Sequence, residues 1–141
     1  PPPPSGPAIG AAVPPTPVLH LDGQGDTLAF DDADRERLVF FFTTTCPSCL
    51  DNQEAWKTLD ARASDSADVI AISLDDLEST RRYRERHGLE FPMAVASDPR
   101  ALATSLGVAA VPTTVRIGVD GRISGTWVGQ LSDDDITAAA G

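Results

Sequence analysis

A strand-length apolar run that leads into a Cys-x-x-Cys pair constrains the fold of this chain more than any other feature. Residues 38–42 are Leu-Val-Phe-Phe-Phe, three threonines follow, and Cys46 and Cys49 come next with Pro47 between them. Residues 52–63 have helical composition, so the pair lies where a strand passes into a helix. Proline is favoured at the first helical position, because its missing N–H would have no partner within the helix. Cys46 is therefore predicted to be the N-cap residue of this helix.

The chemistry predicted for this junction is thiol–disulfide exchange. The free N–H groups and the positive end of a helix favour a thiolate at Cys46. Cys49, Asn52 and Trp56 begin a stripe with a spacing of three and four residues, and such a stripe is predicted to face the core. We expect exposed Cys46 to attack a partner disulfide, and buried Cys49 to resolve the mixed disulfide. The same stripe buries Asn52, whose amide must then be hydrogen-bonded.

Other uses of a cysteine pair fit this sequence less well. The chain has two cysteines, and a bridge that closes a two-residue loop removes little entropy from the unfolded chain. A structural zinc site takes about four ligands, and the two histidines, His20 and His87, lie far from the pair in sequence. Covalent haem attachment needs a histidine where this chain has Leu50. We therefore expect no cofactor other than a redox-active Cys46–Cys49 disulfide.

Length and charge limit the remaining classes of function. A chain of 141 residues can form one domain with a sizeable core. The formal net charge of −10 argues against nucleic acid and anionic membrane surfaces as partners, since both bind basic patches. No apolar stretch approaches the roughly 20 residues that span a bilayer.

Residues 1–17 are predicted to be a linker, separate from a domain over residues 18–141. Eight of these 17 residues are proline, which excludes helix and central strand and favours a semi-rigid extended spacer. The stretch offers little apolar surface to offset the entropy of ordering, so we expect it to be disordered. It would suit a tether to a membrane anchor or a signal sequence upstream of Pro1, or it is an arbitrary linker.

The rest of the chain alternates predicted strands and helices. A hairpin is expected over residues 18–30, strands over 38–42, 69–73, 91–95, 113–117 and 123–128, and helices over 47–63, 75–87, 98–106 and 132–140. Asp120-Gly121 is typical of a hairpin turn. Alternating strands and helices followed by a hairpin predict an α/β fold, with a mixed sheet covered by helices on both faces.

The helix expected over residues 75–87 carries a concentration of arginines. Asp75 and Glu78 fit a capping box at its start, and Gly88 fits a C-cap at its end. Its arginines are predicted to form a solvated face that pairs with Glu78 and Glu85. They are Arg81, Arg82, Arg84 and Arg86.

Three features together resemble the thioredoxin superfamily. They are the strand–Cys-x-x-Cys–helix junction, the Val111-Pro112-Thr113 step before a strand, and the Asp120-Gly121 hairpin whose second strand ends at Gly129. The segment from about Leu77 to Leu106 is similar to the insertion that distinguishes TlpA/ResA-like extracytoplasmic thiol–disulfide oxidoreductases from plain thioredoxins. The resemblance covers residues 18–140.

The resemblance implies a thioredoxin fold with an extra β-α insertion before a cis-proline loop. Val111-Pro112 would be a cis peptide that faces the cysteines and leaves the backbone of residue 111 free to bond an extended peptide. Thr45 and Pro47 would border the same substrate site. The family also implies a monomer that reduces extracytoplasmic protein disulfides, such as those of apo-cytochromes, and is recharged by a membrane electron donor.

Two positions depart from the family pattern, and two other functions stay open. Thr45 stands where the family usually has tryptophan, and Asn52 where it commonly has an acidic residue.

A peroxiredoxin would place a threonine three residues before its attacking cysteine, where this chain has Thr43, but it would also place a proline where this chain has Val39. A metal-binding module such as a copper chaperone would use a wider cysteine spacing and a positioned histidine. Peroxide turnover or copper retention would separate these alternatives.

Overall fold

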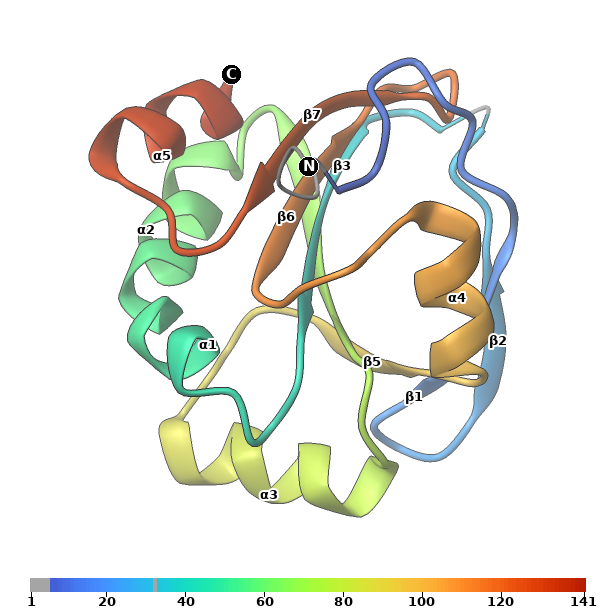
Figure 1. Ribbon diagram of the computed structural model, residues 1–141, viewed down its shortest axis with the longest axis vertical. Helices are drawn as coiled ribbons and strands as arrows, with labels where there is room; N and C mark the ends of the chain where they lie inside the picture. The colour runs from blue at the N-terminus through green and yellow to red at the C-terminus, as the bar shows by residue number, and fades with distance from the viewer. Residues whose placement is uncertain (1–5, 32) are drawn as a thin grey trace.

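The computed structural model describes residues 6–31 and 33–141, which form seven strands and five helices (Figure 1). In chain order they are β1 (Thr16–His20), β2 (Gly25–Leu28), β3 (Glu36–Phe42), α1 (Pro47–Asp51), α2 (Gln53–Ala63), β4 (Ala67–Ser73), α3 (Leu77–His87), β5 (Met93–Ala96), α4 (Pro99–Leu106), β6 (Thr113–Ile117), β7 (Ile123–Val128) and α5 (Asp133–Ala140). The strands form one sheet in the order β2-β1-β5-β4-β3-β6-β7. β4 is parallel to β3 and β5, and the other neighbours are antiparallel, so the predicted mixed sheet is confirmed.

The central strand β3 is covered on both faces, as its unbroken apolar sequence predicts. Leu38, Phe40 and Phe42 point to one face, where they pack with side chains of α2, α3 and α5. Val39 and Phe41 point to the other face, where they pack with α4. All five side chains are at most 2% exposed. The strand that leads to the cysteines is therefore fixed from both sides.

The segment before β1 packs along β7 and differs from the linker expected for it. The Ala11 carbonyl oxygen accepts a hydrogen bond from the Ile123 N–H at 2.9 Å, and the Val13 N–H donates to the Gly121 carbonyl oxygen at 2.9 Å. These bonds cover an edge strand that would otherwise present unpaired backbone groups.

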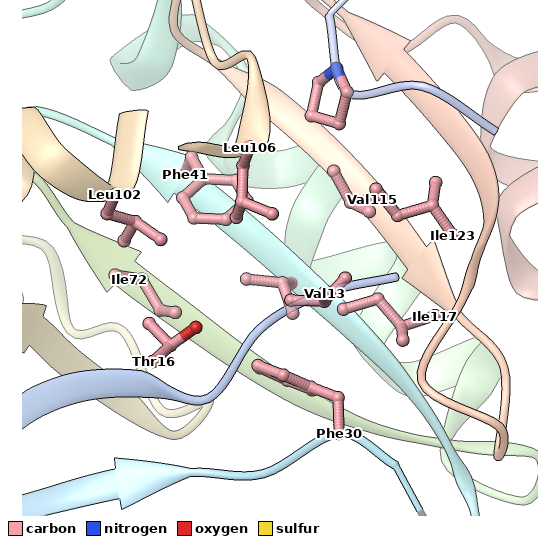
Figure 2. Close-up of a pocket in the computed structure, with 12 residues that line it drawn as sticks. Val13, Thr16, Phe30, Phe41, Ile72, Leu102, Leu106, Val115, Ile117 and Ile123 are labelled. Atoms are coloured by element: carbon pink, nitrogen blue, oxygen red, sulfur yellow. The ribbon is translucent and has the colours of Figure 1, made fainter. Parts of the chain in front are cut away.

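Val13 also closes the apolar core on the α4 face of the sheet. Figure 2 shows Val13 among apolar side chains that come from β3, β4, β6, β7 and α4, with Phe30 beside it. The gap that remains between them is about 10 Å³, no more than one water molecule would fill. For residues 6–17 the prediction of a disordered linker is therefore wrong, and β1 begins at Thr16, before the predicted boundary at 18. Residues 1–5 lie outside the described residues.

Two helix boundaries also differ from those predicted. The helix expected over residues 47–63 is broken at Asn52, whose backbone adopts φ −90° and ψ −2° between α1 and α2. α3 starts one residue later than predicted, because the N-cap is Asp76 rather than Asp75 and accepts a hydrogen bond from the Ser79 N–H. Its end is as predicted, with Gly88 in the left-handed region at φ 59°.

Candidate active site

The two cysteines lie at the start of α1, where the sequence predicts them. Cys46 is the N-cap residue, Pro47 is the first residue of the helix, and the Cys46 sulfur accepts a hydrogen bond from the Cys49 N–H at 3.1 Å. Both side chains are free thiols. The helix start therefore brings the two sulfur atoms together without a bond between them, which is the reduced form of a dithiol site.

The two thiols differ in burial. Cys46 is partly exposed, whereas Cys49 is 0% exposed. Burial, with smaller contributions from the hydrogen bond to Cys46 and from the charge of Asp75, raises the pKa of Cys49 to about 12. At neutral pH Cys49 is thus a protonated thiol within the core, and Cys46 is the sulfur that a partner molecule can reach.

The Val111-Pro112 loop faces the cysteines, as the resemblance implies. The bond between Val111 and Pro112 is cis. The Cys46 sulfur lies 3.6 Å from the Val111 carbonyl oxygen, and the Cys46 thiol can donate a hydrogen bond to this oxygen. The Pro112 carbonyl oxygen accepts a hydrogen bond from the Gly129 N–H at 2.8 Å, just beyond β7. The sheet therefore holds this loop in place beside the reachable sulfur.

The structure brings the predicted substrate-binding residues to the same end of the sheet. Thr45 and Pro47 flank Cys46 in sequence and are exposed. Val111 is partly buried and Pro112 is buried. Exposed backbone and side chains therefore surround the Cys46 sulfur on the α1 side, and the cis-proline loop borders it on the other. Contact of these four residues with a substrate stays a prediction.

Asp75 is a site residue that the sequence interpretation assigned to a helix cap. Its carboxylate accepts hydrogen bonds from the Thr44 N–H at 2.6 Å and from the Thr44 hydroxyl at 2.7 Å. The end of β4 thereby anchors the segment that carries Cys46. The sequence does carry a signal for this role. Asp75 and Asp76 are adjacent and only one of them can cap the helix, so the other is free to bond a neighbouring segment.

Asn52 lies on the buried stripe behind Cys49, as predicted, and is 1% exposed. Its amide oxygen accepts a hydrogen bond from the Leu131 N–H at 2.9 Å. Within the described residues its amide nitrogen has no hydrogen-bond partner. One turn on, the Trp56 ring N–H donates to the Thr114 hydroxyl at 2.9 Å. The stripe therefore ties the cysteine helix to β6 and to the segment between β7 and α5.

Both histidines make their contacts with residues other than the cysteines. His20 bonds Asp26 at 2.8 Å near the first hairpin, and His87 contacts the Tyr83 ring edge-on at 4.7 Å between ring centroids. Over residues 6–31 and 33–141, no group of three or more His, Cys, Asp and Glu side chains is arranged to hold a metal ion.

Comparison with known proteins identifies the fold and the family. No curated protein matches this sequence significantly. Among solved structures, StoA from Bacillus subtilis is 18% identical with a TM-score of 0.74, over 93% of this chain and 99% of that one. The thioredoxin domain of a thiol-disulfide oxidoreductase from Bacteroides vulgatus is 19% identical with a TM-score of 0.74, over 93% and 94%. MTB DsbF, in its mixed oxidized and reduced forms, is 16% identical with a TM-score of 0.70, over 88% and 91%.

These structural similarities confirm the thioredoxin fold. The sequence model of the Redoxin family matches residues 8–140, which is nearly the whole chain. The chain therefore belongs to the Redoxin family.

Proposed function

We propose that this protein is a thiol–disulfide oxidoreductase that exchanges electrons with protein disulfides through Cys46 and Cys49. The observation that carries the proposal is the unequal burial of two neighbouring free thiols, one partly exposed and one 0% exposed. A structural dithiol has no need of such asymmetry. A two-step exchange needs this asymmetry, because one thiol must be exposed to attack the partner disulfide and the other must stay protected until it resolves the mixed disulfide.

The exchange conserves atoms and electrons at each step. The Cys46 thiolate attacks one sulfur of the partner disulfide, whose S–S bond breaks, and the second partner sulfur leaves as a thiolate that takes up a proton. Cys49 then loses its proton and attacks the Cys46 sulfur, and the first partner sulfur leaves. The partner gains two electrons and two protons, and the protein holds a Cys46–Cys49 disulfide. The reverse sequence oxidises a partner dithiol.

We assign recognition of the partner chain to Thr45, Pro47, Val111 and Pro112. Two facts support this assignment. Thr45 and Pro47 are exposed on either side of Cys46, and the Val111 carbonyl oxygen lies 3.6 Å from the Cys46 sulfur. An extended peptide that presents its cysteine to Cys46 must therefore pass over these residues.

The direction and setting of the reaction follow from the family resemblance. We propose a monomeric reductant outside the cytoplasm, supplied with electrons by a membrane donor, with protein disulfides of the cytochrome-maturation type as substrates. A tether upstream of Pro1 belongs to the same proposal. In the part of the chain that the structure describes, no helix combines the length and apolar character needed to cross a bilayer.

Turnover assays separate this proposal from the two alternatives. With an excess of a small dithiol, the protein should reduce a protein disulfide catalytically, and this activity should vanish in Cys46→Ser. Its Cys46–Cys49 reduction potential decides between net reduction and net oxidation, since 30 mV corresponds to about 1.4 kcal/mol. Turnover of hydrogen peroxide without disulfide reduction would contradict the proposal in favour of a peroxidase. Stoichiometric copper retention without disulfide reduction would favour a metal-binding module.

A further inference from the structure

We propose that a cationic groove beside Cys46, formed by Arg82 and Arg86 of α3, docks an acidic segment of the disulfide partner. This inference rests on the proposed function and adds to it the chemical class of the partner. This cationic groove is the hollow lined by Thr44, Ser79, Arg82, Tyr83 and Arg86.

The cationic groove borders the segment that carries Cys46. It is an open hollow of about 160 Å³ between α3 and the segment that joins β3 to α1. Figure 1 shows this connecting segment reaching α3 before it turns into α1. Thr44 is two residues before Cys46, so its Cα atom lies within about 7 Å of the Cys46 Cα atom. The groove is therefore within reach of a partner bound at Cys46.

The two arginines of the groove are available to an incoming anion. Arg82 and Arg86 are four residues apart, so they lie one turn apart on the same face of α3, and both are exposed. Neither forms a salt bridge with any residue in ranges 6–31 and 33–141. By contrast, Arg81 pairs with Glu78 at 2.7 Å.

The polar groups behind the two arginines are already engaged. The Tyr83 side chain is largely buried, and its oxygen accepts a hydrogen bond from the Gln53 amide at 2.8 Å. Thr44 directs both its N–H and its hydroxyl to Asp75. The groove therefore has a fixed floor, and the two guanidinium groups are its charged donors. Guanidinium groups bind carboxylates with paired hydrogen bonds, which favours an acidic ligand.

The negative charge of the whole protein makes the two arginines of the groove stand out as a binding place for an acidic partner. The chain carries a formal net charge of −10, so an acidic partner is repelled from most of its surface. A pair of free arginines next to the reactive sulfur would instead attract that partner and orient it there. An extended chain advances about 3.3 Å per residue, so glutamates within about four residues of the partner's cysteine would reach the groove.

Matched disulfide peptides test this inference. Three peptides closed by the same disulfide would carry two Glu, two Gln or two Lys residues within four positions of the attacked cysteine, on either side. The reduced protein should oxidise to its Cys46–Cys49 form about three- to tenfold faster with the Glu peptide than with the Gln peptide at low salt. This ratio should fall toward one as salt screens the charges. The Lys peptide should be slowest.

Variants assign the effect to the groove. Arg82→Gln with Arg86→Gln should bring the Glu-to-Gln rate ratio to about one, and Arg82→Lys with Arg86→Lys should retain most of it. The matched control is Arg62→Gln with Arg100→Gln, which removes the same charge from exposed positions on α2 and α4 and should keep the ratio. Because each variant is compared with itself, a change in its folding or intrinsic thiol reactivity cancels in the ratio.

Four outcomes would overturn the inference. Equal rates for the Glu and Gln peptides in the wild-type protein would do so, and so would an equal loss of preference in the control variant. Binding of vesicles with anionic lipid, lost in the Arg82→Gln and Arg86→Gln variant while the peptides react equally, would assign the groove to a membrane surface instead. Failure to exchange with any peptide would contradict the proposed function itself, and the inference with it.

Discussion

The Cys46 sulfur and the Cys49 N–H are joined by a hydrogen bond of 3.1 Å, so one turn of helix fixes one sulfur while it buries the other. Pro47 makes this arrangement possible, because it begins the helix without presenting an N–H that needs a partner. The buried sulfur is held within reach of the exposed one. The division of roles between attacking and resolving thiol is therefore built into the start of α1.

The reduced protein should lose stability in alkali through Cys49. Burial raises the pKa of this thiol to about 12 in the folded state, whereas a cysteine in the unfolded chain titrates near 8.5. The folded state therefore holds the proton more tightly. Its contribution to the free energy of unfolding is complete below about pH 8.5 and is lost as the pH rises toward 12. Denaturant unfolding of the reduced protein above neutral pH measures this decline.

The Cys49→Ala variant and the oxidised protein are the controls for this measurement, since neither has the Cys49 thiol. Both should show a smaller alkaline loss than the reduced wild type. An identical pH dependence in all three would show that Cys49 does not titrate differently in the folded and unfolded states.

Replacing Asp75 with asparagine should lower the pKa of Cys49 and weaken the anchor of Thr44. The negative charge of Asp75 disfavours a thiolate at Cys49, and its carboxylate accepts two hydrogen bonds from Thr44. Hydrogen bonds to a charged group contribute about 1.5–3 kcal/mol, so we expect a loss of at least about 1 kcal/mol in the free energy of unfolding. The ultraviolet absorbance of the thiolate against pH, measured in a Cys46→Ala background, reports the pKa.

Thr44→Val is the matched control for Asp75→Asn. It removes the hydroxyl bond but keeps the charge, so it should lower stability without lowering the pKa of Cys49. If Thr44→Val and Asp75→Asn shift the thiolate titration equally, the charge of Asp75 is not what acts on Cys49.

Truncating Val13 should destabilise the domain. Val13 is 7% exposed in the core on the α4 face, so Val13→Ala should cost about 1–2 kcal/mol of unfolding free energy. Ile9 lies in the same segment but is 71% exposed, and Ile9→Ala should change stability by less than about 0.5 kcal/mol. Thermal or denaturant unfolding compares the two. Equal, small effects would show that the segment before β1 does not pack on the sheet in solution.

Asn52→Asp should make stability depend on pH in a way that the wild type does not. The new carboxyl can still accept the hydrogen bond of the Leu131 N–H, but at a site that is 1% exposed its pKa is raised by burial. The folded variant then holds a proton that the unfolded chain releases near pH 3.9. Relative to the wild type, the variant is therefore most stable below about pH 4 and loses stability as the pH rises through the folded pKa.

The difference in unfolding free energy between wild type and Asn52→Asp, measured near pH 4 and near pH 7, tests this. Asn52→Leu provides the comparison, because it leaves the Leu131 N–H without a partner and should cost about 1–3 kcal/mol at both pH values. A constant difference for Asn52→Asp would mean that solvent reaches position 52.

Local signals made the fold and the cysteine site predictable from sequence. The apolar run of β3, the proline after Cys46 and the three-and-four spacing of Cys49 and Asn52 each depend on neighbours a few residues away, and each is found in the structure. The mixed character of the sheet also followed, because alternating strands and helices that end in a hairpin allow few arrangements.

Contacts between distant segments could not be predicted in the same way. The local capping-box rule favours Asp75, which has Glu78 three residues on, but the Asp75 carboxylate is engaged by Thr44, 31 residues away, and Asp76 caps the helix instead. The packing of residues 6–15 depends on β7, as in the bond from Arg122 to the Gly10 carbonyl oxygen across 112 residues. The arginines of α3 were expected to pair with Glu78 and Glu85. Within the described residues only Arg81 forms such a pair, with Glu78, and the lack of a carboxylate partner for the other three emerges only from side-chain positions.

Covalent trapping tests the central claim most directly. Cys49→Ser removes the resolving thiol, so mixed disulfides between Cys46 and partner proteins or disulfide peptides should accumulate, detectable as adducts that a small reductant releases. Cys46→Ser leaves only a buried thiol of high pKa and should trap almost nothing. Equal trapping by the two variants, or trapping by Cys46→Ser alone, would contradict the assignment of Cys46 as the attacking thiol.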